Sequence, residues 1–347
     1  MSNSAQGGVS NRPEGDNSAW LALQPEEVLE PGLPICDPHH HLWDFEAHRY
    51  LLPELLGDLN SGHNVRSSVF IECTAMYRAT GPDALRPVGE TEFVNGVAAM
   101  SASGRYGPTR ACAGIVGFAD LSRGSRVEAV LEAHLAAGGG RFRGIRHVSA
   151  HDPSDAIRPS HTAPPPQLLG EARFRKGFAR LGALGLSFDA WLYHRQIPQL
   201  TDLARAFPDQ PIVLDHVGGP LGIGPYVGRR DEIFPEWRRS IRALAECPNV
   251  RVKLGGLGMK IIGYEFHKRT RPPSSEELAD LWRPTIETCI EAFTPQRCMF
   301  ESNFPVDKVS GSYCVYWNAF KRLASGASES EKAALFHDTA ETFYRLG

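Results

Sequence analysis

Residues 111–149 read ACAGIVGFADLSRGSRVEAVLEAHLAAGGGRFRGIRHVS, and much of the chain repeats their pattern. The segment opens and closes with short apolar runs, ACAGIVGFAD and FRGIRHVS, that are typical of buried strands. Between the two runs, apolar residues recur at helical spacing from Val127 to Leu135, and Gly138 begins the stop signal. The segment therefore predicts a strand, a helix and a second strand.

Eight runs of this kind divide the chain, and most lack the polar and apolar alternation of a half-exposed strand. Continuous apolar runs are expected where helices cover both faces of a parallel sheet. The eight runs lie at residues 33–41, 67–74, 111–120, 142–149, 186–193, 211–218, 250–258 and 298–305. Eightfold alternation with helical segments predicts an α/β fold, a single (β/α)8 TIM barrel. An open doubly wound sheet is the second choice, because no glycine-rich phosphate loop follows the first run.

The composition argues against nucleic-acid binding and membrane binding, and it indicates the cellular compartment. The 347 residues carry a net charge of -3, so the chain has no overall field that would attract nucleic acid or an anionic membrane. It has no run of about eighteen apolar residues that would span a bilayer. Seven scattered cysteines lack the spacing of a zinc or disulfide framework, which predicts reduced thiols in a cytoplasmic protein. We expect a small-molecule substrate, and self-association into a homo-oligomer is left open.

The first residues differ from the rest of the chain. They are rich in Ser, Asn and Gly, and such a composition buries too little apolar surface to offset the entropy of ordering. We therefore expect a flexible N-terminal arm at residues 1–30 and one barrel domain at residues 31–347.

Loop lengths indicate where a site would lie. The connections from each helix to the next strand are short and marked by Gly or Pro, whereas long irregular segments follow the first, second, fourth, sixth and seventh runs. In a barrel these long segments all lie on the face formed by the carboxyl ends of the strands, where active sites are assembled.

Polar residues gather at these same strand ends. In CDPHHHLWDF (36–45), His39 and His41 are two residues apart, so their side chains share a face and can bind a metal or an anion, or transfer protons. Ionisable groups in buried strands are costly unless they are paired or used. Further candidates at the strand ends are Glu72, Arg143, Arg146, Asp189, Trp191, Asp215, His216, Lys253, Glu301 and Asn303.

Each of these candidates also has a structural reading. Asp215 could orient the neighbouring His216, and Trp191 could serve packing. Lys253 could simply pair with a nearby carboxylate. Arg143 and Arg146 are three positions apart, so both can face inward only if a bulge or the strand end intervenes.

Five segments in order, DPHHHLWD, RGIRH, LDHVGGP, VRVKLGGLG and RCMFESNFPVD, resemble the amidohydrolase superfamily. The resemblance is to the amidohydrolase-2 group, which includes 2-pyrone-4,6-dicarboxylate lactonase and sugar lactonases. It implies a distorted (β/α)8 barrel hydrolase in which His39, His41, His216 and position 303 surround the scissile carbonyl. It also implies that Arg143 or Arg146 anchors a substrate carboxylate, as a guanidinium fork can do.

The chain departs from this family at position 303. Family members usually read FGSDWP, with the aspartate acting as general base, whereas this chain reads FESNFP. Asn303 can orient water or donate a hydrogen bond, but it cannot accept the proton. Glu301 would share a strand face with Asn303 and lie about 6–7 Å deeper. We expect Glu301 to be the relocated carboxylate, ahead of Asp307 and Glu72.

The resemblance leaves the metal open. His39 and His41 with Glu72 could hold one divalent metal, zinc first, with water in the remaining position. The fifth run, LSFDAWLY, has no histidine where metal-dependent relatives often place one, and some lactonases of this group work without metal.

The expected activity is hydrolysis of a lactone, a cyclic ester, by attack of water on its carbonyl. The substrate would be small and either carboxylated or polyhydroxylated, and its binding residues would include Arg143, Arg146, Lys253, Trp191 and Tyr77. One alternative is a metal-dependent decarboxylase of an aromatic or muconate-type acid. The other is a non-catalytic barrel that binds a small acid.

Overall fold

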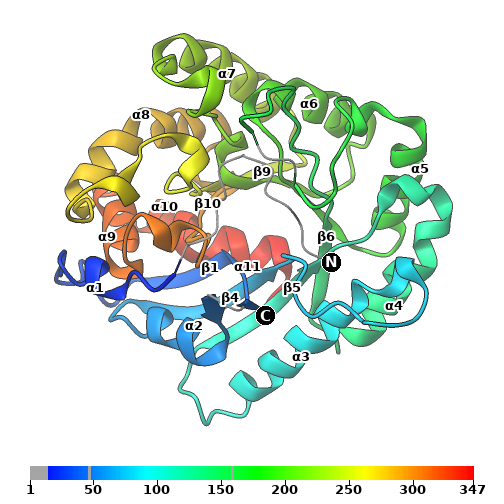
Figure 1. Ribbon diagram of the computed structural model, residues 1–347, viewed down its shortest axis with the longest axis horizontal. Coiled ribbons are helices and arrows are strands. Elements are labelled where there is room, and N and C mark those ends of the chain that lie inside the picture. The colour runs from blue at the N-terminus through cyan, green and yellow to red at the C-terminus, as the bar shows by residue number, and fades with distance from the viewer. Residues whose placement is uncertain (1–14, 46–47, 158–159) are drawn as a thin grey trace.

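In the computed structural model, eight parallel strands form a nearly closed barrel with helices packed around it (Figure 1). The structure describes residues 15–45, 48–157 and 160–347. The strands, in sheet order, are β1 (Pro34–His40), β4 (Asn64–Ile71), β5 (Arg110–Gly117), β6 (Phe142–Arg146), β7 (Ser187–Ala190), β8 (Ile212–Leu214), β9 (Val250–Leu254) and β10 (Cys298–Phe300). Each strand falls on one of the eight apolar runs, so the predicted TIM barrel is confirmed.

The helices follow the strands as the repeated pattern predicts. Their bounds are α1 (Ser18–Leu21), α2 (Leu52–Leu59), α3 (Val88–Ala102), α4 (Glu128–Ala137), α5 (Ala172–Ala183), α6 (Ile197–Ala206), α7 (Arg230–Ala245), α8 (Ser275–Phe293), α9 (Tyr313–Leu323), α10 (Glu329–Ala333) and α11 (Thr339–Tyr344). In α4, the predicted stripe buries Val130 and Leu131. Within the described residues, no helix is both long and apolar enough to cross a membrane. All seven cysteines are free.

The first long loop contains structure that the sequence did not indicate. A short antiparallel hairpin joins β2 (Trp43–Phe45) to β3 (His48–Tyr50). Strands of three residues are too short to show a periodicity, which is why the pattern missed them. The hairpin places the Trp43 ring parallel to that of His41, with centroids 6.0 Å apart.

The barrel closes between its last and first strands. A parallel bridge pairs His40 with Phe304, and the backbone N–H of Asn303 donates to the carbonyl of His39 at 2.9 Å. This seam sets the paired histidines of the first strand beside the turn that follows β10.

The C-terminal helix lies across the barrel (Figure 1). Ala340, Phe343, Tyr344 and Leu346 pack into the interior apolar cluster with residues from five of the eight strands, including Val69, Val213 and Met299. The guanidinium of Arg345 donates to carbonyls of Arg143 and Gly185, at the amino ends of β6 and β7. Helix α11 therefore covers the amino end of the barrel and leaves the carboxyl end for the site.

The expected N-terminal arm is only partly described. Residues 1–14 lie outside the described residues. Further along, the backbone N–H of Leu29 donates to the side-chain oxygen of Asn318 at 2.9 Å, and Lys321 donates to the carbonyl of Leu29 at 2.7 Å. The boundary at residue 31 stays a prediction.

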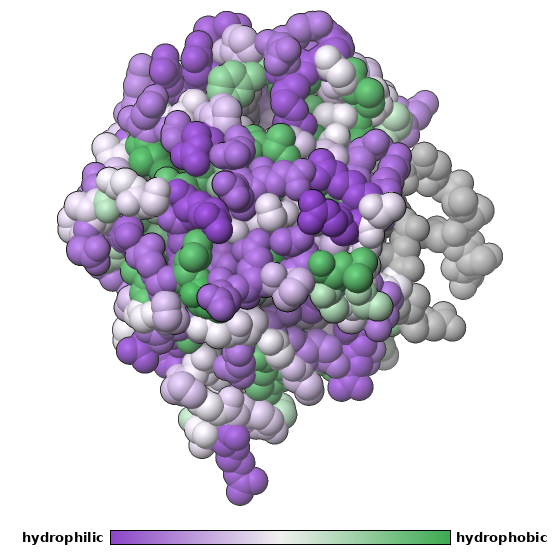
Figure 2. Space-filling view, turned by 90° about the vertical axis from the view of Figure 1, so that its left-hand side faces the viewer, coloured by the Kyte–Doolittle hydropathy of each residue, from purple (hydrophilic) through white to green (hydrophobic). Residues whose placement is uncertain are grey.

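The outer surface in Figure 2, the left-hand side of Figure 1, is mostly hydrophilic, and its apolar side chains form small separate patches. Patches of this size are ordinary on a protein surface. Self-association also stays a prediction.

Candidate active site

Three imidazoles meet at the carboxyl end of the barrel. The ring centroids of His39 and His216 are 4.4 Å apart, and those of His39 and His41 are 5.0 Å apart. All three side chains are buried. The imidazoles predicted from the first and sixth apolar runs therefore come together in one cluster.

The backbone after β8 explains how His216 reaches this position. His216 and Val217 both have positive φ, 53° and 48°, so the chain turns sharply at the strand end. Gly256, which belongs to the VRVKLGGLG segment, lies directly against the ring. A Cβ on Gly256 would lie 2.5 Å from the His216 ring, so only glycine fits there.

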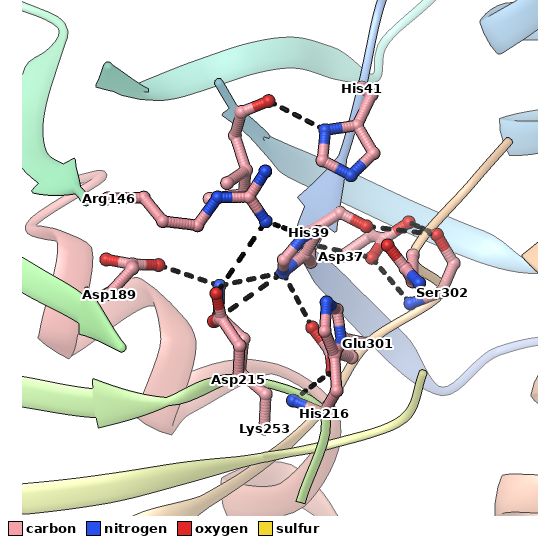
Figure 3. A network of polar contacts seen from close by, with 12 residues as sticks. Asp37, His39, His41, Arg146, Asp189, Asp215, His216, Lys253, Glu301 and Ser302 are labelled. Carbon is pink, nitrogen blue, oxygen red and sulfur yellow. Dashed lines mark hydrogen bonds and ion pairs between the residues drawn. The ribbon is translucent and has the colours of Figure 1, made fainter. Parts of the chain in front are cut away.

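Glu301 joins two of the imidazoles (Figure 3). Its Oε1 accepts from Nδ1 of His216 at 2.6 Å, and its Oε2 lies 2.8 Å from Nδ1 of His39. Burial opposes ionisation of this carboxyl, but His216 and His39 outweigh that effect and hold the pKa of Glu301 at about 2. An ionised carboxylate only accepts hydrogen bonds, so His216 donates through Nδ1 and keeps Nε2 as its basic nitrogen.

Lys253 lies beneath His39 in a group of buried charges. Its Nζ is 2.8 Å from Oδ2 of Asp189, 3.0 Å from Oδ1 of Asp215 and 3.1 Å from Nδ1 of His39. Burial alone would lower the pKa of Lys253, but Asp189 and Asp215 raise it above its usual value. Lys253 is therefore paired with carboxylates, as the structural interpretation expected. Its ammonium is buried and is not exposed to a substrate.

Of the two arginines on β6, only Arg146 enters the cluster. Its Nε donates to Oε1 of Glu72 at 2.8 Å, and its Nη1 lies 3.3 Å from Nε2 of His39. Arg143 instead donates to the carbonyls of Gly140 and Phe142 at the amino end of β6. Spacing by three on a strand sends the two side chains to opposite faces, so the structure does not support Arg143 as a substrate anchor.

The expectation that Glu301 and Asn303 share a strand face is wrong. Strand β10 ends at Phe300, and Asn303 has φ 54°, so the period of two does not extend to it. The amide of Asn303 donates to Asp307 Oδ1 at 2.8 Å. Asp307 also accepts from the backbone of Gly258, and burial raises its pKa well above the usual value. Asn303 and Asp307 therefore bind each other beside the cluster.

Two further expected residues border the cluster. The Trp191 ring packs edge-on against His216, with centroids 4.7 Å apart. Tyr77 is half-buried, and its hydroxyl has no hydrogen-bond partner within the described residues. Burial, reinforced by the charge of Glu72, raises the pKa of Tyr77. Trp191 thus supports an imidazole, while Tyr77 has an unused donor.

The donors that could hold a metal differ from the expected set. His39, His216 and Glu301 each offer a ligand atom, and the three atoms lie within 4.8 Å of one another. In the expected set, His41 turns Nδ1 towards the carbonyl of Ile71 at 2.8 Å, and Glu72 is paired with Arg146. Among the described residues, His39, His41 and Glu72 do not form a donor group of this kind.

The balance of buried charges around His39, His216 and Glu301 also favours a bound cation. Within residues 15–45, 48–157 and 160–347, the buried carboxylates of Glu72, Asp189, Asp215 and Glu301 face two buried cations, Arg146 and Lys253. Buried charges are stable only when they are paired, and a divalent cation would offset this acidic excess.

Sequence reasoning missed two residues that support the site. Asp37 Oδ1 accepts from the backbone N–H of Ser302 at 3.0 Å and so fixes the turn after Glu301. Tyr344 donates to Asp189 Oδ2 at 2.6 Å from the C-terminal helix. Asp37 lies within the quoted DPHHH segment and could have been noted, whereas no spacing links Tyr344 to Asp189.

A cavity of about 690 Å³ lies apart from the imidazoles, between the loop after β8 and helices α7 and α8. Its lining includes Tyr226, Arg230, Trp237 and Tyr264. None of the imidazoles or charged residues of the cluster lines it, so we do not assign the chemistry to this cavity.

The chain is similar to several known proteins. The family model described as Amidohydrolase matches residues 36–346. An uncharacterized protein of Sinorhizobium fredii, y4mH, is 36% identical over 90% of this chain and 99% of its own length. An L-fucono-1,5-lactonase of Burkholderia multivorans is 27% identical over 89% of this chain and 95% of its own length. A zinc-bound crystal structure of a B. multivorans amidohydrolase has a TM-score of 0.69 at 26% identity, covering 90% of this chain and 99% of that one.

Proposed function

The chain belongs to the amidohydrolase family, and from that premise we propose that it hydrolyses the ring ester of a small polyhydroxylated lactone. The observation that carries the proposal is the clamp of Glu301 on His39 and His216 at the carboxyl end of the barrel. The similarity to an L-fucono-1,5-lactonase supports a sugar-derived substrate. The free cysteines are consistent with a cytoplasmic enzyme.

His216 is the proposed proton acceptor. Its Nδ1–H is fixed by Glu301, so Nε2 is free to take a proton from the attacking water. The ionised Glu301 stabilises the imidazolium that forms, and the same proton then passes to the ring oxygen that leaves as an alcohol. In this scheme Glu301 replaces the missing aspartate by orienting the base, because a carboxyl with a pKa of about 2 is a weak base itself.

Arg146 is the proposed stabiliser of the carbonyl oxygen. Its guanidinium is buried within hydrogen-bond distance of His39, and Glu72 fixes its orientation. A fixed donor in a buried site stabilises the negative charge that develops on the oxygen during attack. Trp191 packs edge-on against His216 and shields this imidazole from solvent.

The donor set fits a divalent cation held by His39, His216 and Glu301, with zinc as the first choice. When bound there, such a cation would polarise the carbonyl and lower the pKa of water. The proton transfer through His216 described above belongs to the metal-free alternative, because a histidine nitrogen that binds the cation cannot also accept a proton.

Metal content separates the two alternatives. We expect untagged protein, stripped and then titrated with zinc chloride, to bind about one equivalent by calorimetry, and Glu301→Gln to bind at least about tenfold more weakly. Elemental analysis of the untreated protein provides an independent measurement. Full turnover in chelator, together with no zinc uptake by wild type, would establish the metal-free alternative.

Charge favours a neutral substrate over a carboxylated one. Arg146 already pairs with Glu72, and the four buried carboxylates named above outnumber the two buried cations. An additional substrate carboxylate would therefore meet a net negative site, and like charges repel strongly where the dielectric is low.

A panel of lactones followed by a pH indicator tests the activity. We expect kcat/KM for neutral sugar lactones to exceed that for 2-pyrone-4,6-dicarboxylate by at least about a hundredfold, which is roughly 2.7 kcal/mol. Release of carbon dioxide from aromatic or muconate-type acids would instead indicate the decarboxylase. Thermal stabilisation by carboxylates without turnover of any lactone would indicate a binding barrel.

A further inference from the structure

The C-terminal helix reaches the buried charges below the imidazoles. The hydroxyl of Tyr344 donates to Oδ2 of Asp189 at 2.6 Å, and Nζ of Lys253 donates to the same oxygen at 2.8 Å. All three side chains are completely buried. The other oxygen of Asp189 has no hydrogen-bond partner among the described residues. Two donors therefore fix this carboxylate through one atom, and Tyr344 supplies one of them.

Lys253 contacts both Asp189 and His39, and so links the position of this carboxylate to the imidazole (Figure 3). Its ammonium lies 3.0 Å from Asp215 Oδ1 and 3.1 Å from His39 Nδ1, the atom that faces Glu301. Movement of Lys253 towards or away from the ring changes the field at this nitrogen, and with it the contact between His39 and Glu301. Three successive contacts thus connect Tyr344 to the imidazole.

The position of Tyr344 is itself fixed. Phe343 and Leu346 pack beside it in the barrel interior, and Arg345 is tied to two backbone carbonyls at the amino ends of β6 and β7. The Tyr344 hydroxyl is therefore a donor in a fixed position, because packing and the Arg345 hydrogen bonds hold the backbone of the helix in place.

We propose that Tyr344 is a positioning residue of the reaction centre, acting on His39 through Asp189 and Lys253. The inference rests on the proposed function only where it concerns turnover. Without the hydroxyl, Lys253 is the single donor to Asp189, and the ammonium moves towards that carboxylate and away from His39. The imidazole is then less well aligned for the reaction, while the substrate-binding groups at the mouth are unchanged.

The chain contains a matched control for this arrangement. Tyr50 is buried and donates to Asp58 Oδ2 at 2.7 Å, and Nζ of Lys308 binds the same oxygen at 2.8 Å. This second group of Tyr, Asp and Lys joins β3, α2 and the segment after β10, outside the imidazole cluster. Tyr50→Phe therefore removes the same kind of bond without touching His39.

The test compares Tyr344→Phe with Tyr50→Phe, since both keep the ring and its packing. We expect Tyr344→Phe to lower kcat about tenfold with KM within twofold of wild type, and Tyr50→Phe to leave kcat unchanged. In a Lys253→Met background, Tyr344→Phe is expected to lower kcat no further, because residues that act through one another are not additive. A kcat for Tyr344→Phe within twofold of wild type, or an equal loss in Tyr50→Phe, would overturn the inference.

A second measurement does not depend on any substrate. In protein with ¹⁵N-labelled histidine, we expect Tyr344→Phe to move the Nδ1 resonance assigned to His39, and Tyr50→Phe to leave it in place. If no lactone is turned over, the proposed function fails and this resonance still decides the inference. An unmoved His39 resonance in Tyr344→Phe contradicts it directly.

Discussion

Glu301→Gln is expected to lower kcat by about a thousandfold or more, with the protein still folded. The substitution keeps the size of the side chain and removes the charge that holds Nδ1 of His216 and Nδ1 of His39. The imidazolium formed during turnover would lose its buried counter-charge, and an amide nitrogen would face ring N–H groups. A thousandfold loss corresponds to about 4 kcal/mol of transition-state stabilisation. Steady-state kinetics, with circular dichroism as the check on folding, measures it.

Asp307→Asn is the matched control, because it makes the same chemical change in a carboxyl group near the end of β10. Asp307 binds Asn303 and the backbone of Gly258 and contacts neither histidine through its carboxyl group, and burial raises its pKa well above the usual value. The substitution therefore leaves the contacts of Glu301 with the histidines in place. We expect its kcat to stay within about threefold of wild type. A large loss in Asp307→Asn together with a small one in Glu301→Gln would mean that the reaction uses the other carboxyl.

The sequence could place the strands and the first imidazoles because their signals are local. An apolar run marks each strand, and spacing by two brings His39 and His41 to one face. The same rule failed at Asn303, because it holds only while the backbone stays extended and Asn303 has φ 54°. The choice of Glu301 as the relocated carboxylate stays a prediction, although its contact with both histidines favours it.

The supporting contacts could not be read from the sequence in the same way. Tyr344 and Asp189 are 155 positions apart, and no periodicity connects a C-terminal helix with the fifth strand of the barrel. The metal donors illustrate the same limit. Glu72 appeared available as a ligand until the structure placed Arg146 against it, and that pairing depends on how neighbouring strands are staggered.

Arg146→Met is expected to destabilise the protein and to slow the reaction, and a second substitution separates the two effects. Glu72 is completely buried, and in this variant it loses the one close cationic partner of fixed charge that it has among the described residues. Removing one member of a buried pair costs about 3–5 kcal/mol, because the other charge is left uncompensated. Urea denaturation should therefore show a lower midpoint for Arg146→Met.

Arg146→Met combined with Glu72→Gln removes both charges of the pair, so we expect most of the lost stability to return. Turnover is not expected to return with it. If the guanidinium stabilises the developing charge on the carbonyl oxygen, kcat of the double variant stays about a hundredfold or more below wild type, the usual cost of losing one such donor. Recovery of kcat along with stability would show that the pair only supports the fold, and the oxygen would then need a different partner. If stability recovers and kcat does not, Arg146 stabilises the fold through Glu72 and serves the reaction separately. The low kcat could not then be caused by an unpaired buried charge, because the double variant contains none.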